Sequence, residues 1–147
     1  MRIQIRHPFP SDLPILDKLE KISFSDFFSR KLLDALAFST FGEFLVAEAD
    51  GLIAGYVSAV FEDDFASITS IAVHPDYKRK QIARKLMLQL LETLRKKRIL
   101  DVKLEVRESN DAAKKLYDAL GFKTSHVEHR YYDDGEKAII MCLTLKK

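Results

Sequence analysis

Three neighbouring stretches of the chain carry the apolar patterns that β-strands show. Residues Phe44–Ala49, Leu52–Phe61 and Ala66–Val73 are rich in β-branched and aromatic side chains, a composition typical of strands that bury at least one face. Asp50-Gly51 separates the first two, and Glu62-Asp63-Asp64 separates the second from the third; both are short turn signals. Because sequential strands joined by short turns pair side by side, the pattern predicts an antiparallel meander.

Helical periodicity flanks this meander on both sides. Two short helices precede it, separated by the aromatic-rich segment Ser23–Phe28, and the second begins at the capping residue Ser29. A third amphipathic helix follows it, with apolar residues at every fourth position. The apolar positions of the three helices are Leu13, Leu16, Leu19 and Ile22; Leu32, Leu33 and Leu36; and Ile82, Leu86, Leu90 and Leu94.

The remaining elements complete an alternating β/α pattern. Two further strands are predicted at Arg2–His7 and Leu100–Arg107. A last hairpin joins Val127–Tyr132 to Lys137–Leu145 around the turn Asp133-Asp134-Gly135. Before it, a helix capped by Asn110 runs through Ala119 and stops at Gly121. Leu100–Arg107 follows a helix-length crossover and is expected to pair parallel to Ala66–Val73. We therefore predict an α/β (α+β) fold in one domain, residues 1–147, of order β-α-α-β-β-β-α-β-α-β-β. Helices flank its central sheet, which is mixed and mostly antiparallel.

Composition narrows the classes of function. The 147 residues are 47% hydrophobic and 31% charged with net charge +2, which describes a globular protein and argues against a general nucleic-acid binder. The single cysteine, Cys142, excludes an intramolecular disulfide, and its strand-forming neighbours predict that it is buried. With no signal-like or membrane-length apolar run, we expect a cytoplasmic monomer or weak homodimer that binds neither membrane nor nucleic acid.

The stretch from Ile71 to Leu86 carries the first candidate site. A strand ending at Val73 leads through a turn into a basic cluster, Lys78–Arg84, and then into the third helix. The first turn of a helix leaves N–H groups unpaired and adds partial positive charge, which suits a pyrophosphate. On spacing alone, a strand–helix junction with a solvated basic rim is the favoured explanation.

The residues in this stretch resemble the acetyl-CoA loop of the GCN5-related N-acetyltransferases (GNAT). The family pattern is Arg or Gln, two residues, Gly, one residue, then Gly or Ala; Lys78, Gln81 and Ala83 occupy those places. Lys78 replaces Arg or Gln, and Gln81 replaces the first glycine, so we expect Gln81 to donate its N–H from a helical conformation. The resemblance assigns acetyl-CoA contacts to Ile71, Ala72, Val73, Lys78, Arg79, Lys80, Gln81, Ile82, Ala83, Arg84 and Asn110.

Acetyl transfer to an amine requires a neutral amine and a proton for the departing thiolate, so it needs a base and an acid. Glu105 lies on the polar face of its predicted strand, and Tyr117 lies on the next helix. Taken alone, these side chains read as a surface carboxylate and a half-buried aromatic. The run Leu104-Glu105-Val106-Arg107 through Tyr117 to Phe122 resembles the ribosomal-protein alanine N-acetyltransferases and their archaeal relatives. That resemblance implies that Glu105 is the general base and Tyr117 the general acid.

The same resemblance predicts an acetyl-CoA-dependent N-acetyltransferase that acts on protein N-termini, with a ribosomal protein as one candidate acceptor. It places acceptor contacts on Phe24 and Asp26, in the connection between the first two helices, and on Tyr131 and Tyr132 in the last hairpin. The amine is expected to attack the thioester directly, and no metal is expected. Two alternatives stay open: a small-molecule amine N-acetyltransferase and a non-catalytic acyl-CoA-binding module.

Overall fold

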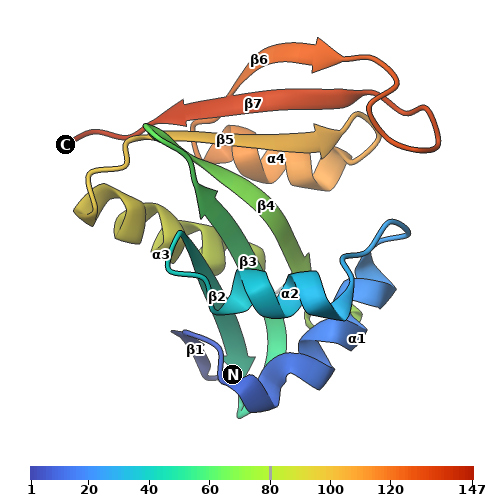
Figure 1. Cartoon of the computed structure of the whole chain (residues 1–147), viewed down its shortest axis with the longest axis vertical. Coiled ribbons are helices and arrows are strands. Elements are labelled where there is room, and N and C mark those ends of the chain that lie inside the picture. The colour runs from blue at the N-terminus through green and yellow to red at the C-terminus, as the bar shows by residue number, and fades with distance from the viewer. Residues whose placement is uncertain (80) are drawn as a thin grey trace.

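A seven-stranded sheet in the order β1-β2-β3-β4-β5-β7-β6 runs through the computed structural model (Figure 1), which describes residues 1–79 and 81–147. The strands are β1 (Ile3–Arg6), β2 (Gly42–Ala49), β3 (Leu52–Phe61), β4 (Phe65–Val73), β5 (Asp101–Arg107), β6 (Lys123–Glu128) and β7 (Ala138–Thr144). Every neighbouring pair is antiparallel except β4 and β5, which are parallel. The predicted fold class and element order are confirmed.

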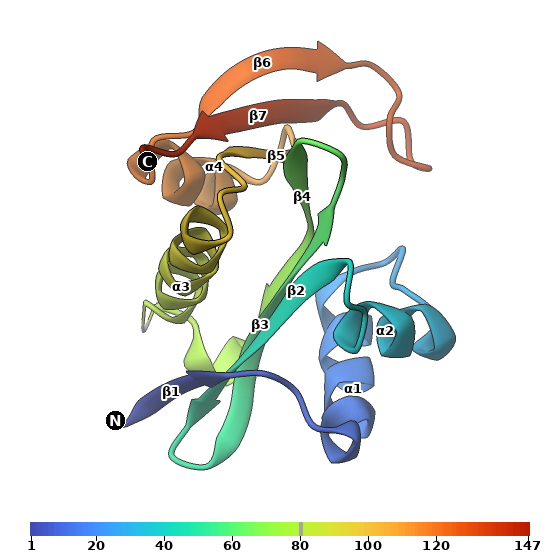
Figure 2. The ribbon, with the colours of Figure 1, turned by 60° about the vertical axis from the view of Figure 1, so that its left-hand side comes forward.

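Helices cover the two faces of this sheet (Figure 2). They are α1 (Leu13–Ser23) and α2 (Arg30–Ala37) on one face, and α3 (Ile82–Lys96) and α4 (Asp111–Ala119) on the other, with short 3-10 turns η1 (Pro10–Asp12) and η2 (Pro75–Tyr77). The predicted caps form: Ser29 Oγ accepts from the Leu32 N–H at 3.1 Å, and Asn110 Oδ1 accepts from the Ala113 N–H at 3.2 Å. In the described part of the chain, no helix is both long and apolar enough to cross a bilayer.

Each face of the sheet has its own hydrophobic core. The larger core packs α3 residues such as Leu86, Leu90 and Leu94, all fully buried, against β2 to β5. The smaller core joins α1 and α2 to the opposite face through Leu16 and Leu33, also fully buried. Because both faces are covered, the middle of the sheet is rigidly supported.

The parallel pair β4 and β5 stays together over only half its length. The ladder runs from Phe65 opposite Asp101 to Ile68 opposite Leu104, whereas β4 continues to Val73 and β5 to Arg107. Beyond Ile68, β4 follows β3, and β5 follows β7. The two arrows diverge accordingly in Figure 1. This divergence opens the sheet at its centre.

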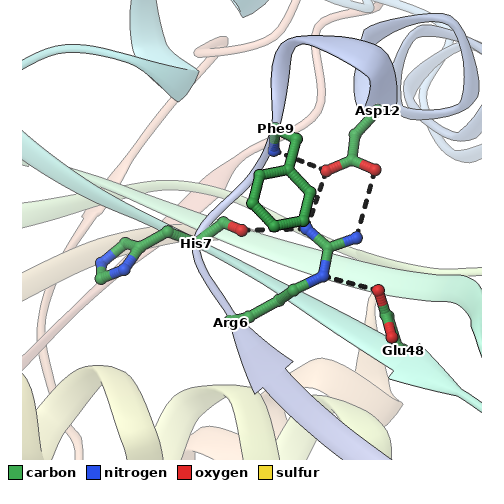
Figure 3. Close-up of polar contacts among 5 residues, drawn as sticks. All are labelled: Arg6, His7, Phe9, Asp12 and Glu48. Atoms are coloured by element: carbon green, nitrogen blue, oxygen red, sulfur yellow. Dashed lines mark hydrogen bonds and ion pairs between the residues drawn. The ribbon is translucent and has the colours of Figure 1, made fainter.

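An ion-pair network ties the N-terminal strand to the start of α1 (Figure 3). The Arg6 guanidinium lies between two carboxylates, with Nη1 2.8 Å from Asp12 Oδ2 and Nε 2.6 Å from Glu48 Oε1. The Phe9 N–H also donates to Asp12 Oδ2, at 2.7 Å. The Arg6 guanidinium and the Phe9 N–H hold the pKa of Asp12 below its usual value, against the opposing effect of burial. The network therefore stabilises the turn from β1 into α1.

Some sequence predictions were wrong in detail. The first arm of the last hairpin is Lys123–Glu128 rather than Val127–Tyr132. The predicted strand could not continue to Tyr132, because Arg130 has φ 53° and lies in the left-handed region, which an extended strand does not adopt. Tyr131 and Tyr132 therefore lie in the connecting loop. The predicted inward residues Ile22 and Leu32 are exposed, because the buried faces of their helices lie on other positions, and Cys142 is exposed on the outward side of β7.

Candidate functional site

A cavity of about 950 Å³ occupies the opening between the diverging halves of β4 and β5. Its walls come from Ile68–Val73 of β4, Leu104–Arg107 of β5, the start of α3, one side of α4 and the α1–α2 connection. Since both strands have lost their mutual ladder here, the described residues leave main-chain N–H and C=O groups of two strand edges facing the cavity. Such edges can bind a ligand that carries amide groups, as another strand would.

Basic residues surround the cavity where α3 begins. Lys78, Arg79 and Arg84 line it together with Gln81, Ile82 and Ala83. The unpaired N–H groups of the first helical turn and the helix dipole lie in the same place. This end of the cavity therefore suits phosphate groups. Of the donor-site residues predicted from sequence, Ile71, Ala72, Val73 and Asn110 also line the cavity, while Lys80 falls outside the described residues.

The backbone at the predicted phosphate loop differs from the helical conformation we expected. Gln81 is the residue before α3 and lies in the left-handed region, at φ 64° and ψ 17°. Arg79 is also left-handed, at φ 65°. This conformation is unfavourable for residues with a Cβ and natural for glycine. The glycine of the family pattern thus marks a backbone requirement, which this chain meets with Gln81.

Glu105 and Tyr117 both line the cavity, from β5 and α4 respectively. The Glu105 side chain is 27% exposed, so a ligand in the cavity can reach it. The Lys103 ammonium lies 3.9 Å from the Glu105 carboxylate. Tyr117 is 5% exposed, and burial, with a smaller contribution from Tyr132, raises the pKa of its hydroxyl to about 12. The Tyr117 hydroxyl consequently keeps its proton near neutral pH. The arrangement can supply a base and an acid to one reacting centre.

The other end of the cavity is bordered by two loops that Arg107 connects. Its guanidinium lies 2.9 Å from Asp134 and 3.0 Å from Glu136 in the β6–β7 loop, and 3.8 Å from Asp26 in the α1–α2 connection. It also stacks over the Tyr132 ring at 4.0 Å. The Arg107 charge thereby holds both loops at the mouth of the cavity.

Of the predicted acceptor residues, Phe24, Asp26 and Tyr132 line the cavity. Burial raises the pKa of Tyr132 to about 12, so its hydroxyl can act as a hydrogen-bond donor at neutral pH. Tyr131 is 50% exposed and packs edge-on against Tyr132, with ring centroids 5.0 Å apart. We therefore place Tyr131 outside the cavity wall, as a support for Tyr132.

Glu20, Ser70 and Arg107 are among the polar residues of this cavity that sequence reasoning overlooked. Glu20 is four residues after Leu16 and so falls on the buried face of α1. A charged residue at a core position is uncommon and was the available signal. Arg107 gave a weaker signal, because it ends a strand of alternating charges. Ser70 gave none.

Comparison with known proteins agrees with this geometry. Residues 13–122 match the family model described as the Acetyltransferase (GNAT) family. The [ribosomal protein bS18]-alanine N-acetyltransferase of Escherichia coli K12 is 33% identical over 138 residues, covering 92% of this chain and 93% of that protein. An N-alpha-acetyltransferase of Sulfurisphaera tokodaii is 36% identical over 115 residues, covering 69% of each chain.

Solved structures give the same result. The crystal structure of the E. coli ribosomal-protein-S18-alanine N-acetyltransferase superposes with a TM-score of 0.91 at 31% identity, covering 99% of this chain and 96% of that one. Ard1 from Thermoplasma volcanium superposes with a TM-score of 0.94 at 25% identity over the full length of both chains. The similarity therefore extends over the β6–β7 hairpin as well as the central sheet.

Proposed function

Because the chain belongs to the GNAT family of acetyltransferases, we propose that it transfers an acetyl group from acetyl-CoA to the N-terminal α-amine of a protein. One observation carries the proposal: a single cavity joins a basic helix start to a loop-bordered mouth, with Glu105 and Tyr117 on its walls. Two relatives add support, since one is named for the alanine of a ribosomal protein and the other for an α-amine. A ribosomal protein is thus one candidate acceptor.

The residues present fit acetyl-CoA. Lys78, Arg79 and Arg84 would neutralise its phosphates, and the N–H groups at the start of α3 would bind its pyrophosphate. The free edge of β4 at Ile71–Val73 would pair with the two amide groups of the pantetheine arm. When bound, acetyl-CoA supplies a thioester whose carbonyl carbon an amine can attack.

Glu105 and Tyr117 would handle two of the three proton transfers in this reaction. Glu105 takes the proton of the incoming ammonium group, directly or through a water. The neutral nitrogen then forms the new C–N bond as the C–S bond breaks, and it loses its second proton to water. Tyr117 gives its proton to the departing sulfur, and its raised pKa keeps the hydroxyl protonated at neutral pH until that step. An α-amine, with a pKa near 8, is roughly one-tenth neutral at pH 7, so this base has a modest task.

The test is turnover of acetyl-CoA against short peptides that differ in their first residue, with the acetylated position found by mass spectrometry. Matched peptides with a blocked α-amine and one internal lysine are the control. We expect acetylation of free N-termini and none of the blocked peptides. Acetylation of small amines but of no peptide would establish the small-molecule alternative. Protection by acetyl-CoA against heat without any turnover would establish the binding module.

A further inference from the structure

The last turn of α1 places a carboxylate inside the protein. Glu20 is 1% exposed, and its Oε1 atom accepts a hydrogen bond from the Tyr56 hydroxyl on β3 and lies 3.5 Å from Ser70 Oγ on β4. Its Oε2 atom accepts from the Phe28 N–H at 2.8 Å. The Tyr56 and Ser70 hydroxyls are themselves 3.0 Å apart. Two strands, one helix and one loop therefore meet at this side chain.

Glu20 is held by hydrogen bonds rather than by an ion pair. Among the described residues, no Lys, Arg or His side chain lies within ion-pair distance of it. Burial and the adjacent Glu20 carboxylate both raise the pKa of Tyr56, which keeps its hydroxyl protonated and able to donate. A buried carboxylate loses its hydration, and hydrogen bonds must offset that cost. What it adds here is a fixed position for the groups that donate to it.

Glu20 fixes the position of the α1–α2 connection, which forms part of the cavity wall. The α1–α2 connection, residues 24–29, places Phe24, Ser25, Asp26 and Phe28 on that wall. The Glu20 side chain holds the far end of this connection, because it accepts from the Phe28 N–H. The near end follows directly from α1, whose last main-chain bond runs from the Phe24 N–H to the Glu20 backbone oxygen at 3.1 Å. Glu20 and the Ser70 side of β4 also line the cavity, whereas Tyr56 is fully buried behind them.

We propose that Glu20, Tyr56 and Ser70 act as positioning residues for the 24–29 connection and thereby set how tightly the acceptor binds. This inference rests on the proposed function, in which that connection faces the acceptor rather than acetyl-CoA. Among the described residues, the basic start of α3 makes no hydrogen bond to Glu20, Tyr56 or Ser70. Loss of the network should therefore weaken acceptor binding and leave acetyl-CoA binding unchanged.

Tyr56→Phe is the sharpest variant, because it removes one hydroxyl and nothing else. The Tyr56 ring is stacked on Phe44, with centroids 5.1 Å apart and planes at 8°, and phenylalanine keeps that contact. Hydrogen bonds to a charged group are strong enough that losing one changes an equilibrium about tenfold or more. We expect the KM for the peptide to rise about tenfold, while kcat and the KM for acetyl-CoA stay within about twofold of wild type. Glu20→Gln should act in the same direction.

Asp12→Asn is the matched control, since it weakens an ion pair at the opposite end of α1. It should lower the melting temperature without raising the peptide KM. A Tyr56→Phe variant that melts lower but has the wild-type peptide KM would overturn the proposal and leave the network with a structural role only.

Amide hydrogen exchange of residues 24–29 separates this inference from the proposed function. We expect faster exchange at Phe28 in Tyr56→Phe and Glu20→Gln than in Asp12→Asn. If the wild-type protein acetylates no peptide, the proposed function fails, and exchange alone decides whether the network holds the connection. Equal exchange in all three variants would overturn the anchoring role, whatever the acceptor is.

Discussion

Replacing Gln81 by glycine should stabilise the protein, although glycine usually weakens a helix. Gln81 has φ 64° and ψ 17°, and its side chain is exposed and makes no capping hydrogen bond. A residue with a Cβ is less stable in this left-handed region than in the right-handed one by roughly 1–2 kcal/mol. Glycine offsets part of that gain, because its unfolded chain has more freedom, worth about 0.4–1 kcal/mol. The expected net gain is about 0.8 kcal/mol, or roughly 2–3 °C in a chain of this length.

Gln89 offers the matched control for this experiment. It is an exposed glutamine within α3, so Gln89→Gly makes the same chemical change in a right-handed helix. There, glycine should cost about 1 kcal/mol. Glycine should therefore raise the stability of the protein at position 81 and lower it at position 89.

Urea unfolding at 25 °C and thermal melting measure both variants directly. Calorimetry with CoA adds the functional side: the backbone N–H groups of the loop remain in Gln81→Gly, so its affinity for CoA should equal or exceed that of wild type. If Gln81→Gly loses as much stability as Gln89→Gly, Gln81 is helical in solution and the left-handed assignment is wrong. A large loss of CoA affinity in the folded variant would show instead that the Gln81 side chain contacts the ligand.

Three further outcomes are expected. Glu105→Gln should lower turnover about tenfold at pH 7 with unchanged CoA affinity, because roughly one-tenth of the α-amine is neutral without a base. The loss should shrink as the pH rises past the α-amine pKa near 8; full activity at pH 7 would place the base elsewhere. Tyr117→Phe keeps the packing against Phe122 and should lower the single-turnover rate without lowering the melting temperature; an unchanged rate would assign the acid role to water. Since the folded pKa of Asp12 is depressed, its stabilising effect is complete above the unfolded value near 3.9 and is lost as pH falls through the lower folded value. The melting temperature of the wild type should thus exceed that of Asp12→Asn at pH 7, and the difference should disappear toward pH 2. A difference in melting temperature that does not depend on pH would contradict the ion-pair explanation.

The elements that sequence predicted well are those whose periodicity reports a buried face. The β2–β4 meander and α3 have apolar residues at the spacing of their final burial, and their turns carry strong local signals. The strand β6 has no such signal, because all six of its residues are exposed at the edge of the sheet. Tyr131 and Tyr132 attracted the strand prediction in its place, since tyrosine favours strands.

The parts of the site that sequence missed depend on contacts between distant segments. Glu20 meets Tyr56 and Ser70 across separations of 36 and 50 residues, and Arg107 meets Asp134 across 27. No local propensity encodes such pairs. Glu105 and Tyr117 were found because a family motif places them, while their nearness to Tyr132 became visible only in the folded chain.

The divergence of β4 and β5 also bears on how this protein avoids aggregation. A strand edge with free N–H and C=O groups is a template on which another chain can add a strand. Here two such edges, at Thr69–Val73 and at Glu105–Arg107, face each other across one cavity inside the same molecule. The α1–α2 connection and the β6–β7 loop border its mouth, so a foreign strand would have to displace both. The protein can thus keep hydrogen-bonding edges ready for a small ligand. The outer edges of the sheet are β1, which has only four residues, and β6, whose exposed Lys123, His126 and Glu128 discourage pairing.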